Sequence, residues 1–167
     1  KKLQKQYAKD AIDTYFSILE SNDGTDKDYV PLIETQRITH LNDMVSIFKS
    51  LWKDKENMPK IGILKGSMTL EQQKKIHNCD VLFAYRGCII DAFNDERINC
   101  LVITCPIKNQ RITNEDLSYD SENMKQLIGR INRKKHNVPA LVIHMYDNYS
   151  YFGKHLNTCF DYYKRNK

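Results

Sequence analysis

Apolar residues along the chain form two kinds of pattern, and the first is a set of short, almost continuous runs. Runs of this kind are typical of strands that are covered by helices on both faces. They span residues 29–35, 60–66, 81–85, 100–107 and 139–146. Pro31 weakens the first run, because proline cannot donate a ladder hydrogen bond. The pattern therefore predicts five buried strands.

The second pattern places apolar residues three and four positions apart, as on one face of a helix. It predicts helices over 40–53, 69–78, 88–94, 121–135 and 149–165, and an amphipathic helix over 1–20. Strand and helix alternate five times, which implies right-handed crossovers. We expect an α/β domain over 28–167, with a mainly parallel sheet of at least five strands. We expect a helical extension over 1–27 to pack on this domain, and ligands to bind at the carboxyl ends of the strands.

Composition narrows the class of protein. The chain has 167 residues, 41% hydrophobic and 28% charged, which fits one soluble globular domain. No apolar run of about 18 residues could span a membrane. The net charge of +5 permits nucleic-acid or nucleotide partners without identifying one. Because the first residue is not methionine, we expect a domain of a longer protein.

The five cysteines are an odd set without C-x-x-C spacing, which predicts reduced thiols in an intracellular protein. His77 and Cys79 are spaced as two zinc ligands could be, but no second pair follows at such a spacing. We therefore expect no metal site.

The stretch "QLIGRINR" (126–133) carries the clearest candidate chemistry. On a helix, Gln126, Arg130 and Arg133 fall within roughly 60° of one another. Guanidinium groups pair bidentately with phosphate. Gly129 costs about 1 kcal/mol of helix stability relative to alanine, which hints at a close approach by another group. Apolar residues occupy the opposite face: Met124, Leu127, Ile128 and Ile131. The alternative is a solvated surface helix that the two arginines merely decorate.

The same stretch matches the Q-x-x-G-R-x-x-R motif VI of superfamily 2 helicases. Three further segments, in the expected order, resemble the second RecA-like domain of that family: "IETQRITHL" (33–41) its motif IV, "IGILKGSMTLEQQKKI" (61–76) the next strand, turn and helix, and "VLFAYRGCIIDAFNDERINCLVITCP" (81–106) its motif V. The resemblance runs from about residue 28 to the C-terminus. It is strongest to the poxvirus transcript-release helicase and phage recombination helicases of large DNA viruses.

This resemblance implies a three-layer RecA-like fold and half of an ATP site. Gln126, Arg130 and Arg133 would act on the γ-phosphate, and Asp91, Asn94 and Gly129 would contribute to nucleotide binding. ATP with Mg²⁺ would be held mainly by a first RecA-like domain, which is the implied protein partner. The implied contacts with DNA or RNA come from six residues: Gln36, Arg37, Gly66, Ser67, Tyr85 and Arg86.

Several of these positions have a simpler interpretation. Gly66 and Ser67 fit an ordinary strand-to-helix turn with Thr69 as the N-cap. His40 fits a packing role at a helix start. Motif V departs from the family, since Tyr85 replaces a threonine and Asn94 replaces an aspartate. Asn94 could still bind a ribose hydroxyl, and Tyr85 could stack on a base. Phe93 is more simply a core residue.

The chain contains neither a G-x-x-x-x-G-K-[ST] phosphate loop nor an Asp-Glu pair that ends a buried strand. We therefore expect this chain alone to be inactive, monomeric and without a bound cofactor. The leading hypothesis is the C-terminal motor domain of an ATP-dependent helicase or translocase, in a reducing intracellular setting such as the host cytoplasm or virion of a large DNA virus. The alternatives are a non-catalytic nucleic-acid-binding or scaffolding module, motivated by the altered motif V, and a free-standing nucleotide-binding enzyme.

Overall fold

A computed structural model describes most of the core of the chain. It describes residues 29–52, 58–66, 68–91, 93–105 and 122–145, together with 10, 13, 157, 159, 160, 163 and 164. The N-terminal extension and most of the last predicted helix lie outside the described residues, and so does Ser67. No helix among the described residues is long and apolar enough to cross a membrane.

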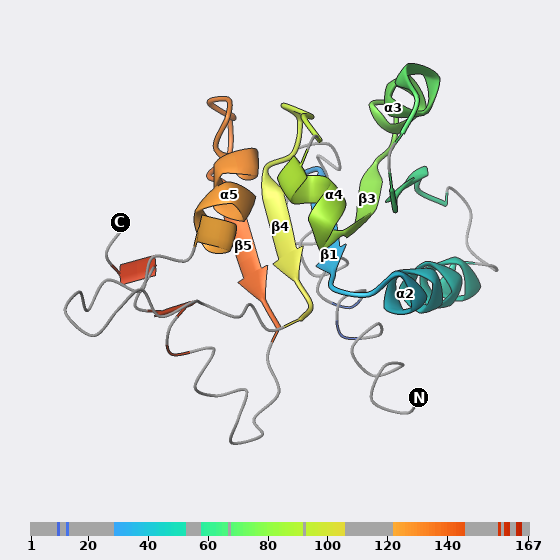
Figure 1. The fold of residues 1–167 in the computed structure, drawn as a ribbon, viewed down its shortest axis with the longest axis horizontal. Coiled ribbons are helices and arrows are strands. Elements are labelled where there is room, and N and C mark those ends of the chain that lie inside the picture. The colour runs from blue at the N-terminus through green and yellow to red at the C-terminus, as the bar shows by residue number, and fades with distance from the viewer. Residues whose placement is uncertain are drawn as a thin grey trace.

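Among the described residues, five parallel strands form one sheet with the order β2-β3-β1-β4-β5. Figure 1 labels β5, β4, β1 and β3 side by side in this order. The strands are β1 (Pro31–Thr35), β2 (Ile61–Leu64), β3 (Val81–Tyr85), β4 (Cys100–Ile103) and β5 (Leu141–His144). The central strands β1, β3 and β4 are buried almost throughout, whereas the edge strand β5 is half-buried. The predicted α/β fold with five parallel strands is therefore confirmed.

Pro31 is accommodated because it is the first residue of β1, where a missing N–H is tolerated. The backbone N–H of Val30, just before it, donates instead to the Asn99 Oδ1 atom at 2.8 Å. Asn99 is itself buried and leads into β4. The Asn99 side chain thus supplies a hydrogen bond between the two segments that lead into β1 and β4.

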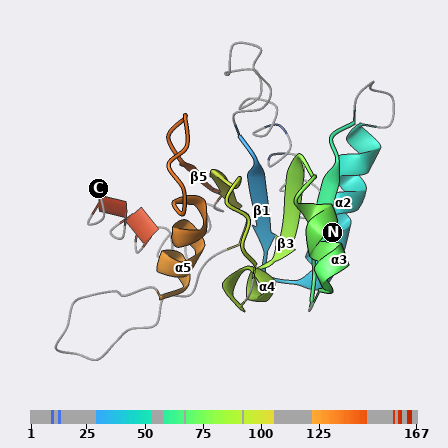
Figure 2. The same ribbon diagram turned by 90° about the horizontal axis from the view of Figure 1, so that it is seen from above.

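Helices cover both faces of the sheet, as Figure 2 shows. One face packs against α2 (Ile38–Leu51) through Leu41, Met44 and Phe48. The other face packs against α3 (Leu70–Ile76), α4 (Arg86–Asp91) and α5 (Glu122–Ile131). Residues of β1 alternate between the two cores, because successive side chains of a strand point to opposite faces.

The start of α3 is a capping box. The Thr69 backbone N–H donates to the Gln72 Oε1 atom at 2.9 Å, and the Gln72 N–H donates to the Thr69 Oγ1 atom at 3.3 Å. The interpretation of Thr69 as an N-cap is therefore confirmed.

The apolar face of α5 also lies where the sequence predicts it, with Met124, Leu127 and Ile131 buried. The helix ends at Ile131 and not at residue 135. The next turn would carry Lys134 and Lys135 in place of apolar residues, so nothing would fix it to the sheet. Arg133 consequently lies beyond the helix, and its predicted position on a helical face was wrong.

Candidate functional site

The arginines of "QLIGRINR" meet the loop that connects α4 with β4. The Arg130 Nη1 atom donates to the Phe93 carbonyl oxygen at 2.7 Å. A guanidinium nitrogen of Arg133 donates to the Asn94 Oδ1 atom. Phe93 is buried, as its interpretation as a core residue requires, whereas Asn94 and Arg133 are exposed. The structure thus brings together residues that lie 37 and 39 positions apart.

Both of these acceptors are neutral oxygens. Partial burial lowers the pKa of Arg130, and the positive charge of Arg133 lowers it further. The neighbouring positive charge of Arg133 therefore destabilises the charged form of Arg130. An anion bound between them would relieve this repulsion and would accept charge-assisted hydrogen bonds.

The other residues predicted for the nucleotide side lie on the same two segments. Gln126 is half-buried on α5. Gly129 is exposed, and a Cβ atom added to it would meet no atom within 4 Å, so this side of the helix is open. Asp91 is the last residue of α4, and its side chain lies outside the described part of the structure.

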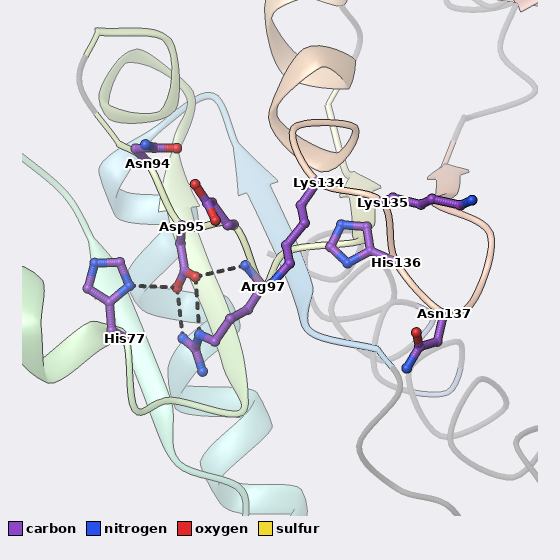
Figure 3. Close-up of a pocket in the computed structure, with 9 residues that line it drawn as sticks. His77, Asn94, Asp95, Arg97, Lys134, Lys135, His136 and Asn137 are labelled. Atoms are coloured by element: carbon purple, nitrogen blue, oxygen red, sulfur yellow. Dashed lines mark hydrogen bonds and ion pairs between the residues drawn. The ribbon is translucent and has the colours of Figure 1, made fainter.

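A pocket of about 590 Å³ adjoins the contact between Asn94 and Arg133. Figure 3 shows one wall formed by the 94–97 loop and His77, and the other by the segment after α5. Both segments lead into strands, so the pocket lies at the amino ends of β4 and β5. It is lined by His77, Asn94, Asp95, Glu96, Arg97, Lys134, Lys135, His136 and Asn137.

Asp95 is the buried charge of this pocket, and sequence reasoning missed it. Its side chain is 1% exposed. The Asp95 Oδ2 atom lies 2.7 Å from the Arg97 Nη2 atom and 3.3 Å from the His77 Nδ1 atom. The spacing of Asp95 and Arg97, two positions apart, was a local signal. His77 lies far away in sequence, so its part in the cluster had no such signal.

At the carboxyl ends of the strands, the predicted nucleic-acid contacts Gln36 and Arg37 are exposed directly after β1. Arg37 is the N-cap residue of α2, and its side chain makes no capping bond. The Thr35 hydroxyl donates to the Arg37 carbonyl oxygen at 3.2 Å and shapes this turn. Two polar side chains therefore face solvent beside the start of a 14-residue helix.

Gly66 and Tyr85 lie at the same edge: Gly66 follows β2, and Tyr85 is the last residue of β3. Gly66 is exposed, and the space that a Cβ atom would fill is open. The ring of Tyr85 lies over Gly87, where an added Cβ atom would be 2.7 Å from its Cε1 atom. Gly87 thus gives the ring its room.

Arg86 differs from the other predicted nucleic-acid contacts, because it is buried. Its Nε and Nη2 atoms donate to both carboxylate oxygens of Glu34 at 2.8 and 2.7 Å, and Nη2 also donates to the Cys105 carbonyl oxygen at 2.9 Å. Burial lowers the pKa of Arg86, but the bonds and charge of Glu34 outweigh this and raise it overall. Its predicted contact with nucleic acid stays a prediction; the observed partner is Glu34.

His40 and the five cysteines have structural surroundings. His40 is buried on α2, and its Nδ1 atom lies 3.6 Å from the Cys105 Sγ atom, in agreement with a packing role. All five cysteines are free. Burial raises the pKa of Cys100 to about 12 and that of Cys159 to about 11, so both thiols are protonated at neutral pH.

Three solved structures share this architecture. The C-terminal part of the Fun30 ATPase domain is 16% identical and has a TM-score of 0.60, over 88% of this chain and 44% of that one. UvsW of T4 is 13% identical and has a TM-score of 0.64, over 98% of this chain and 33% of that one. Mss116p DEAD-box helicase domain 2, bound to an RNA duplex, is 14% identical and has a TM-score of 0.57, over 83% of this chain and 50% of that one.

These similarities show the fold. The chain is an α/β domain that matches the RecA-like domains of helicases, and it spans at most half the length of the structures it matches. No family model and no curated protein matches the sequence. The fold class implied by the motif order is therefore confirmed on structural grounds.

Proposed function

We propose that this chain is the C-terminal motor domain of an ATP-dependent superfamily 2 helicase or translocase. The observation that carries the proposal is the arginine pair, which meets the 93–94 loop through neutral oxygens on a helicase-type fold. The motif order favours the branch of the poxvirus transcript-release and phage recombination helicases. The first RecA-like domain of the longer protein would hold most of the ATP and its Mg²⁺.

The residues present fit a nucleotide phosphate at this position. Arg130 and Arg133 bring two positive charges close together, and the open side of α5 at Gly129 leaves space for a ligand. ATP supplies a phosphoryl group whose transfer to water builds up negative charge. Arg130 and Arg133 would stabilise that charge, an effect worth on the order of 10³ to 10⁵ in rate. Gln126 would orient groups near the γ-phosphate.

The carboxyl-end edge of the sheet would grip the nucleic acid. Gln36, Arg37, Gly66 and Tyr85 would contact backbone phosphates or a base, and the exposure of Gln36, Arg37 and Gly66 supports this role. Nucleotide-driven closure of the two domains would move this edge along a strand. Arg86 is not included, because its guanidinium is paired with Glu34.

The proposal is tested by Arg133→Ala in the full-length protein that contains this chain. We expect nucleic-acid-stimulated ATP turnover to fall at least roughly 10³-fold, since an arginine that stabilises the transition state is lost. The control is Lys49→Ala, which removes one positive charge from the last turn of α2, on the opposite face of the sheet. Unchanged turnover in Arg133→Ala would reject the motor function and favour a non-catalytic nucleic-acid-binding module.

A further inference from the structure

The loop between α4 and β4 provides the acceptors for both arginines, so its own attachment matters. Asn94 is exposed, but the residues on either side of it are buried: Phe93 is 7% exposed and Asp95 is 4% exposed. The residue that accepts from Arg133 therefore has a buried residue on each side of it in the chain. Phe93 is held by apolar packing against the core of the α3, α4 and α5 side.

Asp95 is held by polar contacts on both carboxylate oxygens. Its Oδ1 atom accepts the backbone N–H and the Nε–H of Arg97, each at 3.1 Å. Its Oδ2 atom accepts Arg97 Nη2 at 2.7 Å and lies 3.3 Å from His77 Nδ1 (Figure 3). The carboxylate thus closes the loop on itself and joins it to the end of α3.

Arg97 and His77 extend this connection. The Arg97 guanidinium donates to the Ile76 and Cys79 carbonyl oxygens, each at 3.2 Å, so it bridges Asp95 and the end of α3. The His77 ring stacks on Phe93 with centroids 6.5 Å apart and an interplanar angle of 20°. The two buried neighbours of Asn94 are therefore both linked to the same segment of the chain.

We propose that Asp95 is a positioning residue for the arginine pair. Its contacts with Arg97 and His77 fix the loop whose Phe93 carbonyl and Asn94 side chain orient the guanidinium groups of Arg130 and Arg133. This inference rests on the proposed function, because it assigns Asp95 a part in orienting the phosphate-binding arginines. A misplacement of about 1 Å at such a site can cost about 100-fold in rate.

The ionisation of Asp95 agrees with this role. Burial acts to raise the pKa of its carboxyl, but the hydrogen bonds from Arg97 and the charges of Arg97 and His77 outweigh burial and lower it overall. The carboxylate is therefore charged at neutral pH and can accept from all its partners at once. An asparagine would keep the size of the side chain but would turn a donating NH₂ group toward at least one of these donors.

The test compares Asp95→Asn with Asp80→Asn in the full-length protein. Asp80 lies at the same amino-end edge, where its Oδ2 atom accepts the Lys60 N–H at 2.7 Å, and it has no contact with the arginine loop among the interactions described above. We expect Asp95→Asn to lower the kcat of nucleic-acid-stimulated ATP hydrolysis roughly 10- to 100-fold, with the KM for ATP changed by less than about threefold. Asp80→Asn should leave both constants within about twofold.

A second variant covers the case in which Asp95→Asn does not fold. Arg97→Lys keeps the positive charge but loses the planar fork, and it should lower kcat in the same direction. Folding is checked by the melting temperature of each variant. An equal kcat in Asp95→Asn and Asp80→Asn, or a rise in KM with kcat unchanged, would overturn the positioning role.

The proposed function can fail separately. If Arg133→Ala leaves turnover unchanged, the motor assignment is lost whatever Asp95 does. If Arg133→Ala abolishes turnover while folded Asp95→Asn and Arg97→Lys retain it fully, only the positioning role is lost. A combination with Arg133→Lys adds a direct measure, because Asp95→Asn should reduce the remaining rate much less than it reduces that of the natural protein.

Discussion

Arg86 and Arg130 differ in their electrostatic surroundings, because Arg86 pairs with a carboxylate and Arg130 donates to a backbone carbonyl oxygen. Arg86 is 8% exposed and forms two bonds with the carboxylate of Glu34, which raises its pKa. Arg130 is half-buried, donates to a backbone carbonyl, and has a lowered pKa. The charge of Arg86 is thus neutralised within the fold. The Phe93 carbonyl oxygen that accepts from Arg130 is a neutral acceptor and supplies no such countercharge.

The two arginines also lie at opposite ends of the strands. Arg86 follows β3 at the carboxyl end, and its bonds to Glu34 and to the Cys105 carbonyl connect β3 with β1 and with the end of β4. The Thr104 hydroxyl adds a bond of 2.6 Å to the Glu34 carbonyl oxygen. Arg130 lies near the loop that enters β4. Fold-stabilising charge at the carboxyl end is therefore spatially separate from the candidate phosphate site.

The largest effect on stability is expected from Arg86→Met. This substitution leaves the carboxylate of Glu34 buried without its cation, which should cost about 3 to 5 kcal/mol of unfolding free energy. Urea unfolding of this chain measures the change. Replacing both partners, with Glu34→Leu added to Arg86→Met, should recover most of the loss, since an apolar pair can replace a buried ion pair. A double variant no more stable than the single one would contradict this account.

A smaller, pH-dependent effect is expected at His144, at the carboxyl end of β5. Burial lowers the pKa of His144 from 6.5 to about 4, and the positive charge of Arg86 adds to the shift. Between these two values the unfolded chain binds a proton that the folded chain does not, so stability falls as the pH falls. The loss between pH 7 and pH 5 should be about 2 kcal/mol.

The variant His144→Asn separates this effect from the titration of carboxyl groups. It removes the titrating group, so its stability should depend less steeply on pH between 7 and 5. The comparison requires urea unfolding of both proteins across that range. Parallel pH curves would show that His144 does not carry the predicted shift.

The strands and core helices could be predicted because burial requires apolar residues to recur at the spacing of each element. The run at 81–85 became β3 without change, and the apolar residues of α5 are buried as expected. Strand ends were predicted too long at 100–107 and 139–146, where apolar residues continue past the last ladder pair. Burial can be predicted from local pattern, whereas the end of pairing depends on neighbouring strands.

The candidate site was predicted only in part, for a related reason. Arg130 and Arg133 contact the loop that carries Asn94, and their roles at a nucleotide stay predictions. The surroundings of Arg86 could not be predicted, because Glu34 lies 52 residues away and only the sheet order brings the two together. Asp95 was missed because His77 joins its cluster only where the end of α3 meets the loop before β4, which the sequence pattern does not reveal. Long-range charge pairing decides the role of each arginine, and a single sequence does not contain that information.

The smallest effect is expected from Arg130→Met, which makes the same chemical change as Arg86→Met at the other end of the sheet. A partly exposed site lets water reach the Phe93 carbonyl, and removal of the charge also relieves the repulsion from Arg133. We therefore expect a loss below about 1 kcal/mol in the same urea experiment. A loss as large as that of Arg86→Met would mean that Arg130 is needed by the fold itself. The difference between the two identical substitutions measures how much more the fold depends on the arginine paired with Glu34 than on the arginine that donates to the Phe93 carbonyl oxygen.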